Sequence, residues 1–331
     1  MTARTAGITF DLKDEYLRLG WSVEDASEFD AEETVAAIES ALTSFGWKVE
    51  RIGHVRNLVG ALAAGRRWDV VFNFAEGVRG FGREAQVPAL LDAYDIPYTG
   101  SDPLVMALTL HKGMTKRVVR DLGVPTADFA VVETAAEIDA VDLPFPLFVK
   151  PVAEGSSKGV DATSRVTTRD ELRAACEERV RRFRQPALVE TFLPGREMTV
   201  GIVGTGARAE VVGVMEAVFA VEQDVYSYTA KQDFSDRVSY RLVEGALGAE
   251  AGRLALAAWR GLGCRDVGRM DFRCDAAGRP QFVEVNPLPG MRPGFSELCL
   301  LLDLAGVPYL TFLERVMASA AERFASRGVH P

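Results

Sequence analysis

The sequence predicts a protein of the α/β class, with α+β character, that has more than one hydrophobic core. Helix-like and strand-like patterns alternate over about the first hundred residues, which is typical of an open α/β sheet. From residue 197 onward strand-like runs dominate, and the end of the chain is largely helical. The chain has 331 residues, more than one core usually serves, so two or three sub-domains are expected.

Hydrophobic spacing and turn residues predict the elements of the first half of the chain. A helix, a buried strand and a second helix are expected first, and a turn precedes a third helix that ends at Gly123-Val124-Pro125. A short strand then ends in Lys150 and Pro151 and leads into a loop rich in glycine and serine. In chain order, these elements are a helix over 32–45, a strand over 68–74, helices over 84–94 and 104–122, and a strand over 147–151.

The second half of the chain is predicted in the same way. A charged helix and a strand come first, and several strands follow them. Two strands flank Asp275-Ala276-Ala277-Gly278 and are expected to form a hairpin. The elements are a helix over 168–183, strands over 187–190, 198–203 and 210–216, a helix over 254–262, hairpin strands over 267–274 and 280–285, and helices within 297–324.

Composition excludes several classes of function. The net charge of −9 disfavours non-specific binding to nucleic acid or to anionic membranes. The chain has no run of about 18 apolar residues that would predict a transmembrane helix. Its four cysteines form no C-x-x-C pair, and its three histidines do not support a catalytic triad or a zinc site. A reduced protein of the cytoplasm is therefore expected.

The hairpin carries the most informative group of polar residues. Alternation along a strand places Asp271 on the same face as its neighbours Arg269 and Arg273, and it places Glu284 and Asn286 together on the next strand. Two carboxylates and an amide oxygen form a hard oxygen site that suits Mg²⁺. Apolar neighbours, which include Val283, predict that the opposite face is buried. A solvated surface hairpin is the alternative interpretation.

Two further segments have features of a nucleotide site. Lys150 stands at the end of a strand beside the loop Glu154-Gly155-Ser156-Ser157-Lys158-Gly159, and a lysine with such a loop can hold phosphates. This is not a Walker A sequence, and a surface turn is the alternative. The strand over 187–190 leads into a loop that offers Glu190 and Glu197 as acceptors, although a generic strand end has the same pattern.

Taken together and in this order, these segments resemble the ATP-grasp superfamily, and within it the D-alanine–D-alanine ligase family. The resemblance runs from about residue 70 to about residue 313. Its most specific pieces are Ile96-Pro97-Tyr98-Thr99-Gly100-Ser101, Val149-Lys150-Pro151, Glu154-Gly155-Ser156-Ser157, Gly268-Arg269-Met270-Asp271, Glu284-Val285-Asn286-Pro287 and Pro289-Gly290-Met291. It implies an ATP-grasp fold of three sub-domains, with ATP held between two of them. The expected boundaries are 1–107, 108–193 and 194–331.

The resemblance also implies which residues bind ATP. Lys112 and Lys150 would contact its phosphates, and Ser156 and Ser157 would lie in a loop that closes over them. Lys231 matches a lysine on a mobile loop that reaches the phosphates and takes part in catalysis.

The resemblance implies separate sets of residues that bind the adenine base, bind the metal and stabilise the oxyanion. Glu190 would face the adenine amino group, the backbone of Thr191 to Leu193 would lie against the base, and Glu197 would hold the ribose. Mg²⁺, or Mn²⁺ in its place, would bind the hairpin residues, and catalytic groups would stabilise a tetrahedral oxyanion. The metal ligands are Asp271, Glu284 and Asn286, and the oxyanion groups are Arg269 and the N–H of Gly290.

The activity implied by this resemblance is an ADP-forming carboxylate–amine ligase. Transfer of the γ-phosphoryl group to a carboxylate would give an acyl phosphate, which an amine then attacks. The expected partners are small carboxylates and amines, such as amino acids, and family likeness suggests a homodimer. No nucleic acid or membrane partner is expected.

The segments that hold substrates in the family are changed. The family's Gly-Gly-x-Ser-x-Glu segment is replaced by a stretch in which Asp11, Asp14 and Glu15 either meet a cation or are solvated. Phe295 falls where a serine is expected near the second carboxylate, and Arg292 is an alternative partner for that carboxylate. The sequence therefore predicts a ligase with a different amino acid or small-molecule substrate. A D-alanine–D-alanine ligase proper and a non-catalytic nucleotide-binding protein are the alternatives.

Overall fold

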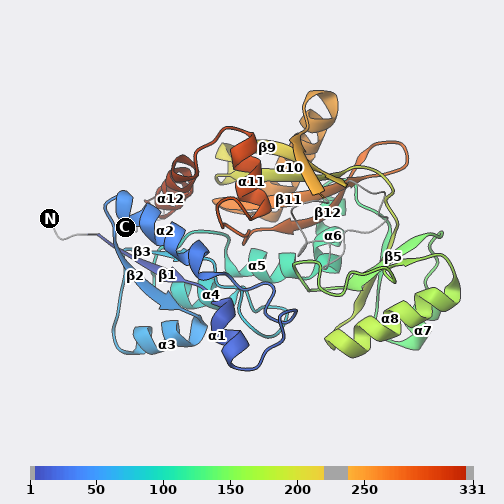
Figure 1. Ribbon diagram of the computed structural model, residues 1–331, viewed down its shortest axis with the longest axis horizontal. Helices are drawn as coiled ribbons and strands as arrows, with labels where there is room; N and C mark the ends of the chain where they lie inside the picture. The colour runs from blue at the N-terminus through green and yellow to red at the C-terminus, as the bar shows by residue number, and fades with distance from the viewer. Residues whose placement is uncertain (1–3, 220–237, 326–331) are drawn as a thin grey trace.

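The computed structural model describes residues 4–219 and 238–325, and these residues form three sheets with helices packed around them (Figure 1). Each sheet falls in one of the three segments that the sequence predicts as sub-domains, although the division at those boundaries stays a prediction. Within the described residues, no helix is both long enough and apolar enough to cross a membrane.

The first sheet is parallel, with the strand order β2-β1-β3. Parallel strands must be joined by crossovers, and helices between them supply these crossovers and bury the strands. This arrangement confirms the open α/β pattern expected for the N-terminal part. Its elements are β1 (Thr5–Thr9), α1 (Lys13–Arg18), α2 (Glu32–Ser44), β2 (Lys48–Gly53), α3 (Val55–Ala63), β3 (Val70–Asn73) and α4 (Gln86–Ala93).

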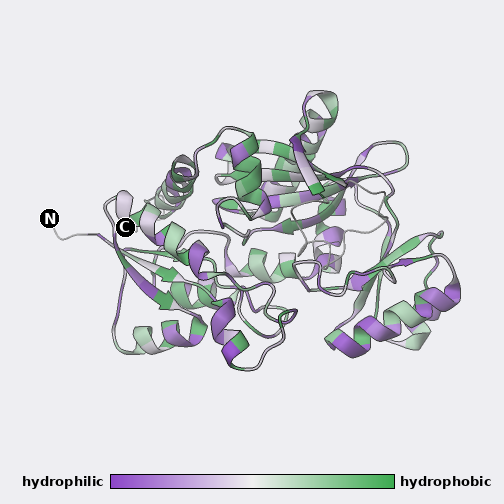
Figure 2. Ribbon diagram, in the orientation of Figure 1, coloured by the Kyte–Doolittle hydropathy of each residue, from purple (hydrophilic) through white to green (hydrophobic). Residues whose placement is uncertain are grey.

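The second sheet has the order β4-β7-β5-β6, and its paired strands are antiparallel. Helix α8 lies against it and is mostly hydrophilic along its length, because only one side of the helix is buried (Figure 2). This sheet and its helices lie at the right of Figure 1, on the far side of the molecule from the first sheet. Its elements are β4 (Phe129–Val132), α7 (Ala135–Asp139), β5 (Leu147–Pro151), β6 (Arg165–Val166), α8 (Arg169–Phe183) and β7 (Ala187–Thr191).

The third sheet is antiparallel, with the order β10-β9-β8-β11-β12, and it includes the expected hairpin. Helix α10 packs on it through the fully buried Trp259, and α11 and α12 follow the last strand. Its elements are β8 (Glu197–Val203), η1 (Gly206–Arg208), β9 (Glu210–Phe219), β10 (Val238–Leu242), α10 (Gly245–Leu262), β11 (Val267–Cys274), β12 (Pro280–Asn286), α11 (Glu297–Leu304) and α12 (Tyr309–Ala325).

The single helix predicted over 104–122 is wrong, because two helices occupy this stretch. They are α5 (Pro103–Leu110) and α6 (Lys112–Asp121), and His111 between them has an extended backbone with φ −88° and ψ 90°. The Nδ1 atom of His111 accepts a hydrogen bond from the N–H of Met114, so the histidine caps α6. This break makes Lys112 the first residue of α6.

Candidate active site

The polar face of the β11–β12 hairpin is as the sequence predicts. Asp271 is paired with Glu284 and Arg269 with Asn286, and the alternating burial of β11 leaves Arg269, Asp271 and Arg273 on its partly exposed face. Asp271 accepts hydrogen bonds from Thr199 Oγ1 at 2.9 Å and from Asn286 Nδ2 at 3.2 Å. These bonds fix the direction of the Asp271 carboxylate before any ligand arrives.

One apolar neighbour departs from the predicted pattern. A β-bulge shifts the register after Asp271, so that Glu284 pairs with Asp271 while Phe282 pairs with Phe272. Val283 is the extra residue of this bulge, and it lines a cavity instead of joining the buried face as expected. The prediction for Val283 is therefore wrong, because alternation along the strand is broken at that residue.

Arg269 is held by two carboxylates. Its Nη1 atom lies 2.6 Å from Asp271 Oδ2 and 2.6 Å from Glu297 Oε2, at the first residue of α11. All three side chains are largely buried, so these ion pairs are only weakly screened by solvent. Sequence reasoning missed Glu297, because its contact with Arg269 depends on how α11 folds back over the hairpin.

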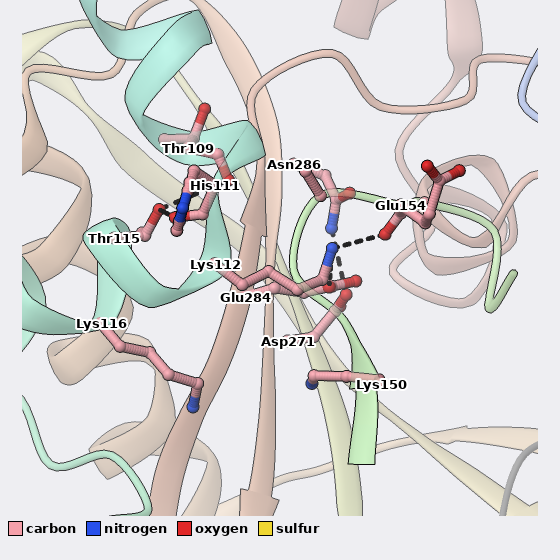
Figure 3. Close-up of polar contacts among 12 residues, drawn as sticks. Thr109, His111, Lys112, Thr115, Lys116, Lys150, Glu154, Asp271, Glu284 and Asn286 are labelled. Atoms are coloured by element: carbon pink, nitrogen blue, oxygen red, sulfur yellow. Dashed lines mark hydrogen bonds and ion pairs between the residues drawn. The ribbon is translucent and has the colours of Figure 1, made fainter. Parts of the chain in front are cut away.

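Lys112 lies at the centre of the polar cluster (Figure 3). Its Nζ atom is 3.2 Å from Glu284 Oε2 and donates to the carbonyl oxygen of Glu154 at 2.5 Å. Its backbone N–H donates to Val152 O at 2.9 Å, which ties the start of α6 to the end of β5. The lysine therefore joins the hairpin of the third sheet to the loop that follows β5.

Lys150 and a second lysine, Lys116, share one buried carboxylate. Lys150 Nζ lies 2.8 Å from Glu190 Oε1, and Lys116 Nζ lies 2.9 Å from Glu190 Oε2. Burial alone would raise the pKa of Glu190, but Lys116 and Lys150 outweigh it and lower this pKa to about 2. Glu190 is therefore charged and already paired on both oxygens, and its predicted role toward adenine stays a prediction.

The pKa values of the two lysines shift in opposite directions in this environment. Burial lowers the pKa of Lys116, which is completely enclosed and also donates to Thr126 Oγ1 at 2.8 Å. Burial acts on Lys150 as well, but the carboxylates of Glu190 and Glu284 outweigh it and raise its pKa. Lys116 was not predicted from the sequence, although it stands four residues after Lys112 on the same face of α6.

The loop after β5 has an unusual backbone. Ser156 and Ser157 have φ values of 49° and 57°, in the left-handed region that residues other than glycine rarely adopt. Strained residues of this kind persist where surrounding contacts hold them. Lys158 supplies such contacts, with Nζ 2.5 Å from Glu154 Oε2 and 3.3 Å from Glu28 Oε1.

The described residues enclose two adjoining cavities that share one set of polar side chains. Lys112, Arg269 and Glu284 line both cavities. The first cavity lies between the second and third sheets, and the second lies toward the first sheet. Of the other predicted site residues, Lys150, Ser157, Glu190, Thr191, Leu193, Glu197 and Asp271 line the first, while Ser156, Asn286 and Gly290 line the second.

Some polar groups of the segment that follows β7 already form hydrogen bonds and an ion pair within the protein. The N–H groups of Thr191 and Phe192 donate to Asp128 O at 2.9 Å and Pro146 O at 3.1 Å. Glu197 forms an ion pair of 3.6 Å with Arg273. Lys231, the remaining predicted site residue, lies outside the described residues.

Gly290 lies in a turn with no room for a side chain. A Cβ atom at this position would lie 2.9 Å from Ser296 Oγ, which accepts a hydrogen bond from the N–H of Arg292. Arg292 lies over the ring of the exposed Phe295 and 3.6 Å from Glu33. Arg292 and the turn at Gly290 therefore line the second cavity, where the sequence predicts a partner for a carboxylate of the substrate.

The N-terminal carboxylates do not reach the second cavity. Asp11 is buried and accepts hydrogen bonds from Tyr16 and, at 2.8 Å, from the N–H of Gly77. Asp14 and Glu15 are exposed on α1. Of the two interpretations offered for this stretch, the solvated loop holds for Asp14 and Glu15, and Asp11 has a structural role.

Comparisons with known proteins agree with this geometry. A family model described as the D-Ala–D-Ala ligase C-terminus matches residues 118–318. D-alanine–D-alanine ligase from Cupriavidus taiwanensis is 37% identical over 246 residues, which cover 72% of each chain. The uncharacterised protein y4sG from Sinorhizobium fredii is 32% identical over 264 residues, 78% of this chain and 77% of that protein.

A solved structure has the same fold. The crystal structure of D-alanine–D-alanine ligase from Bacillus anthracis, complexed with ATP, aligns with a TM-score of 0.74 at 21% identity, covering 99% of this chain and 100% of that one. The fold is therefore ATP-grasp, and the chain is a ligase enzyme of that fold. More narrowly, it belongs to the D-alanine–D-alanine ligase family.

Proposed function

We propose that this chain is an ADP-forming carboxylate–amine ligase that depends on ATP and Mg²⁺ and joins amino acids other than two molecules of D-alanine. The observation that carries the proposal is the cluster of Lys112, Glu284, Asp271 and Arg269 at the junction of two cavities. One cavity has the lysines for a polyphosphate, and the other has room and polar groups for an amino acid.

The residues fit a Mg²⁺ ion that phosphates and water complete. Asp271 and Glu284 face each other across paired strands, and Asn286 lies beside Asp271. The described residues contain no group of three His, Cys, Asp or Glu side chains placed to hold a metal by themselves. This donor set matches Mg²⁺, which keeps few protein ligands and is bound together with substrate phosphates, and Mn²⁺ has similar preferences. The ion would neutralise charge on the phosphates during transfer.

The protein's own groups then have distinct roles. Lys112 and Lys150 would bind the phosphates of ATP, which would lie in the cavity between the second and third sheets, while Ser156, Ser157 and Lys231 would cover them. The loop that carries both serines would exclude water, which matters because an acyl phosphate is readily hydrolysed. Glu190, the Thr191 to Leu193 backbone and Glu197 would hold the base and the ribose.

The proposed reaction consists of a phosphoryl transfer followed by an acyl transfer. A carboxylate oxygen of the first amino acid attacks the γ-phosphorus, and the bond to the β–γ bridging oxygen breaks to release ADP. The amine of the second substrate attacks the resulting acyl carbon, phosphate leaves, and one proton is released. Arg269, held by Asp271 and Glu297, and the N–H of Gly290 would stabilise the oxyanion that develops in this second step.

The substrate side of the site supports a departure from D-alanine. Asp11 is hydrogen-bonded to Tyr16 and Gly77, and the second cavity is instead lined by other carboxylates, which include Asp30 and Glu84. D-alanine–D-alanine ligase activity is the second candidate, because two relatives with that name are 37% and 35% identical to this chain. From its likeness to the family, we also propose that the protein is located in the cytoplasm and forms a homodimer.

A screen of ADP formation tests this function. The full chain would be assayed with ATP, Mg²⁺ and amino acids of both chiralities, singly and in pairs, and products would be identified by mass spectrometry. The proposal expects ADP and an amide product with at least one pair, and loss of both in Asp271→Asn. Turnover of D-alanine alone at a rate typical of a dedicated enzyme would favour the second candidate.

A further inference from the structure

The wall of the second cavity nearest the first sheet is rich in carboxylates. Two segments supply them, the loop between α1 and α2 and the loop between β3 and α4. Neither segment has a part in the ligase chemistry described above. The four carboxylates that line the cavity from these loops are Glu28, Asp30, Glu76 and Glu84.

One of these four carboxylates is already neutralised. Glu28 Oε2 lies 2.9 Å from Arg83 Nη2, and its Oε1 lies 3.3 Å from Lys158 Nζ and accepts from the N–H of Gly155 at 2.5 Å. Burial opposes the charged form, but Arg83 and Lys158 outweigh it and lower the pKa of Glu28. Glu28 therefore serves to hold the loop after β5 and is not available to a ligand.

The other three have no cationic partner within the described residues. Neither Lys13, which lines the same wall, nor any other described lysine or arginine lies within ion-pair distance of Asp30, Glu76 or Glu84. Glu84 is only 8% exposed, yet its carboxylate forms no hydrogen bond among the described residues. A buried carboxylate without a partner is costly, and it lines a cavity that a ligand can enter.

Burial and mutual repulsion keep protons on this group. Burial raises the pKa of Glu84 to about 7, with Arg83 and Lys112 acting against it and Glu28 adding to it. Burial also raises the pKa of Asp30 to about 8, with help from Asp11 and against a hydrogen bond from Thr34. The pKa of Glu76 is also raised, first by burial and then by the charges of Glu84, Glu28 and Asp30. Arg83 acts in the opposite direction.

The end of the cavity formed by the third sheet and the segment after it carries two arginines. Arg269, Arg292 and the turn at Gly290 line it there, next to Glu284 and Asn286. A carboxylate that is to be phosphorylated must lie at that end, where Lys112 reaches Glu284. Lys112 and Glu84 line the same cavity, so the carboxylates without a cationic partner share it with the reacting centre.

We propose that the second cavity binds a basic amino acid, with its carboxylate at the Arg269 end and both its α-ammonium and its side-chain cation at Asp30, Glu76 and Glu84. This substrate class rests on the proposed ligase function. An amino acid with only an α-ammonium would leave two of the three carboxylates without a cation. A diamino acid would leave only one carboxylate without a cation, and that carboxylate can stay protonated. A metal ion fits less well, because the described acidic groups are not arranged to surround one ion.

Calorimetry with matched ligands tests the proposal. The full chain, with Mg²⁺ and a non-hydrolysable ATP analogue, would be titrated with lysine and ornithine of both chiralities, and with norleucine, which has nearly the shape of lysine but one cation fewer. At least one diamino acid should bind about tenfold or more tightly than norleucine of the same chirality, since one charge-assisted hydrogen bond has that effect. Equal binding of lysine and norleucine, or no binding by any diamino acid, would overturn the proposal.

Two further readouts separate charge recognition from a structural effect. Binding of a diamino acid should release protons, seen as a heat that varies with the ionisation enthalpy of the buffer, because the incoming cation lowers the raised pKa values. At least one of Glu76→Gln and Glu84→Gln should weaken lysine binding about tenfold and weaken norleucine binding less, because norleucine lacks the side-chain cation. Glu15→Gln, the same change on exposed α1, should alter neither. Equal weakening of both ligands by both variants, or no weakening of lysine binding by either, would contradict the proposal.

The failure of this proposal can be told apart from the failure of the ligase function. ADP formation with monoamino acids but not with diamino acids would remove the substrate class and leave the ligase intact. Tight binding of lysine without ADP formation by any amino acid pair would keep the cation site and remove the ligase.

Discussion

The buried contact of Glu190 with Lys116 and Lys150 gives a sharp test of how the first cavity is held together. Glu190→Gln keeps the size of the side chain and leaves two buried ammonium groups without their shared counter-ion. The pKa of Glu190 is about 2 in the folded protein, against an ordinary value of 4.5. At 1.36 kcal/mol per pKa unit, the charged form contributes about 3 kcal/mol to the free energy of unfolding at neutral pH.

The dependence on pH has a definite direction. Because the folded-state pKa lies below the unfolded one, this contribution is fully present above pH 4.5 and is lost as the pH falls toward 2. Urea unfolding followed by circular dichroism should therefore show Glu190→Gln to be less stable by about 3 kcal/mol near pH 7, which is the usual effect of breaking a buried ion pair. The difference should shrink below about pH 4.

A matched variant controls for loss of a negative charge as such. Glu133 is exposed beside β4, so Glu133→Gln should change the free energy of unfolding by less than about 0.5 kcal/mol. If Glu190→Gln unfolds like the wild type near neutral pH, or if its deficit does not depend on pH, the reasoning about the two lysines is refuted.

Three other outcomes follow from the same structure. Asp271→Asn should lower ADP formation by about a hundredfold or more in a Mg²⁺ titration, because it removes a proposed metal ligand and one of the two partners of Arg269; saturation at wild-type rates would refute the metal assignment. Glu297→Gln should lower kcat by about tenfold to a hundredfold with little change in the KM for ATP, because Arg269 loses one of its two anchors; a change in KM alone would contradict that role. Burial raises the pKa of the cysteine thiols, those of Cys176 and Cys299 to about 12, so a thiol reagent at about pH 8 should label the native chain slowly and label all four cysteines after denaturation. Fast labelling of the native chain would show that the thiols are accessible.

Local patterns were enough to predict the hairpin and its polar face. Alternation along a strand depends only on neighbouring residues, so it correctly placed Asp271 with Arg269 and Glu284 with Asn286. The same reasoning failed at Val283, because a bulge changes the count of residues without any marker in the sequence. It also failed at His111, whose extended backbone splits an otherwise continuous helical pattern.

Contacts between distant segments could not be predicted in this way. Lys116 and Glu297 become part of the site only because α6 packs against the second sheet's Glu190 and because α11 returns to Arg269. The sequence leaves open whether Asp11 meets a cation or is solvated, and in the structure it accepts a hydrogen bond from the N–H of Gly77 instead. The carboxylates that do line the second cavity come from loops with no periodic pattern, so only the folded chain brings them together.

The most direct test of the central claim follows oxygen from a carboxylate to phosphate. Amino acids labelled with ¹⁸O in the carboxylate, including lysine and ornithine, would be incubated with the full chain, ATP and Mg²⁺, and the released phosphate would be analysed by mass spectrometry. An acyl phosphate predicts one labelled oxygen in each phosphate, together with ADP and an amide product. Amide formed with unlabelled phosphate, or with AMP and pyrophosphate in place of ADP, would contradict the account.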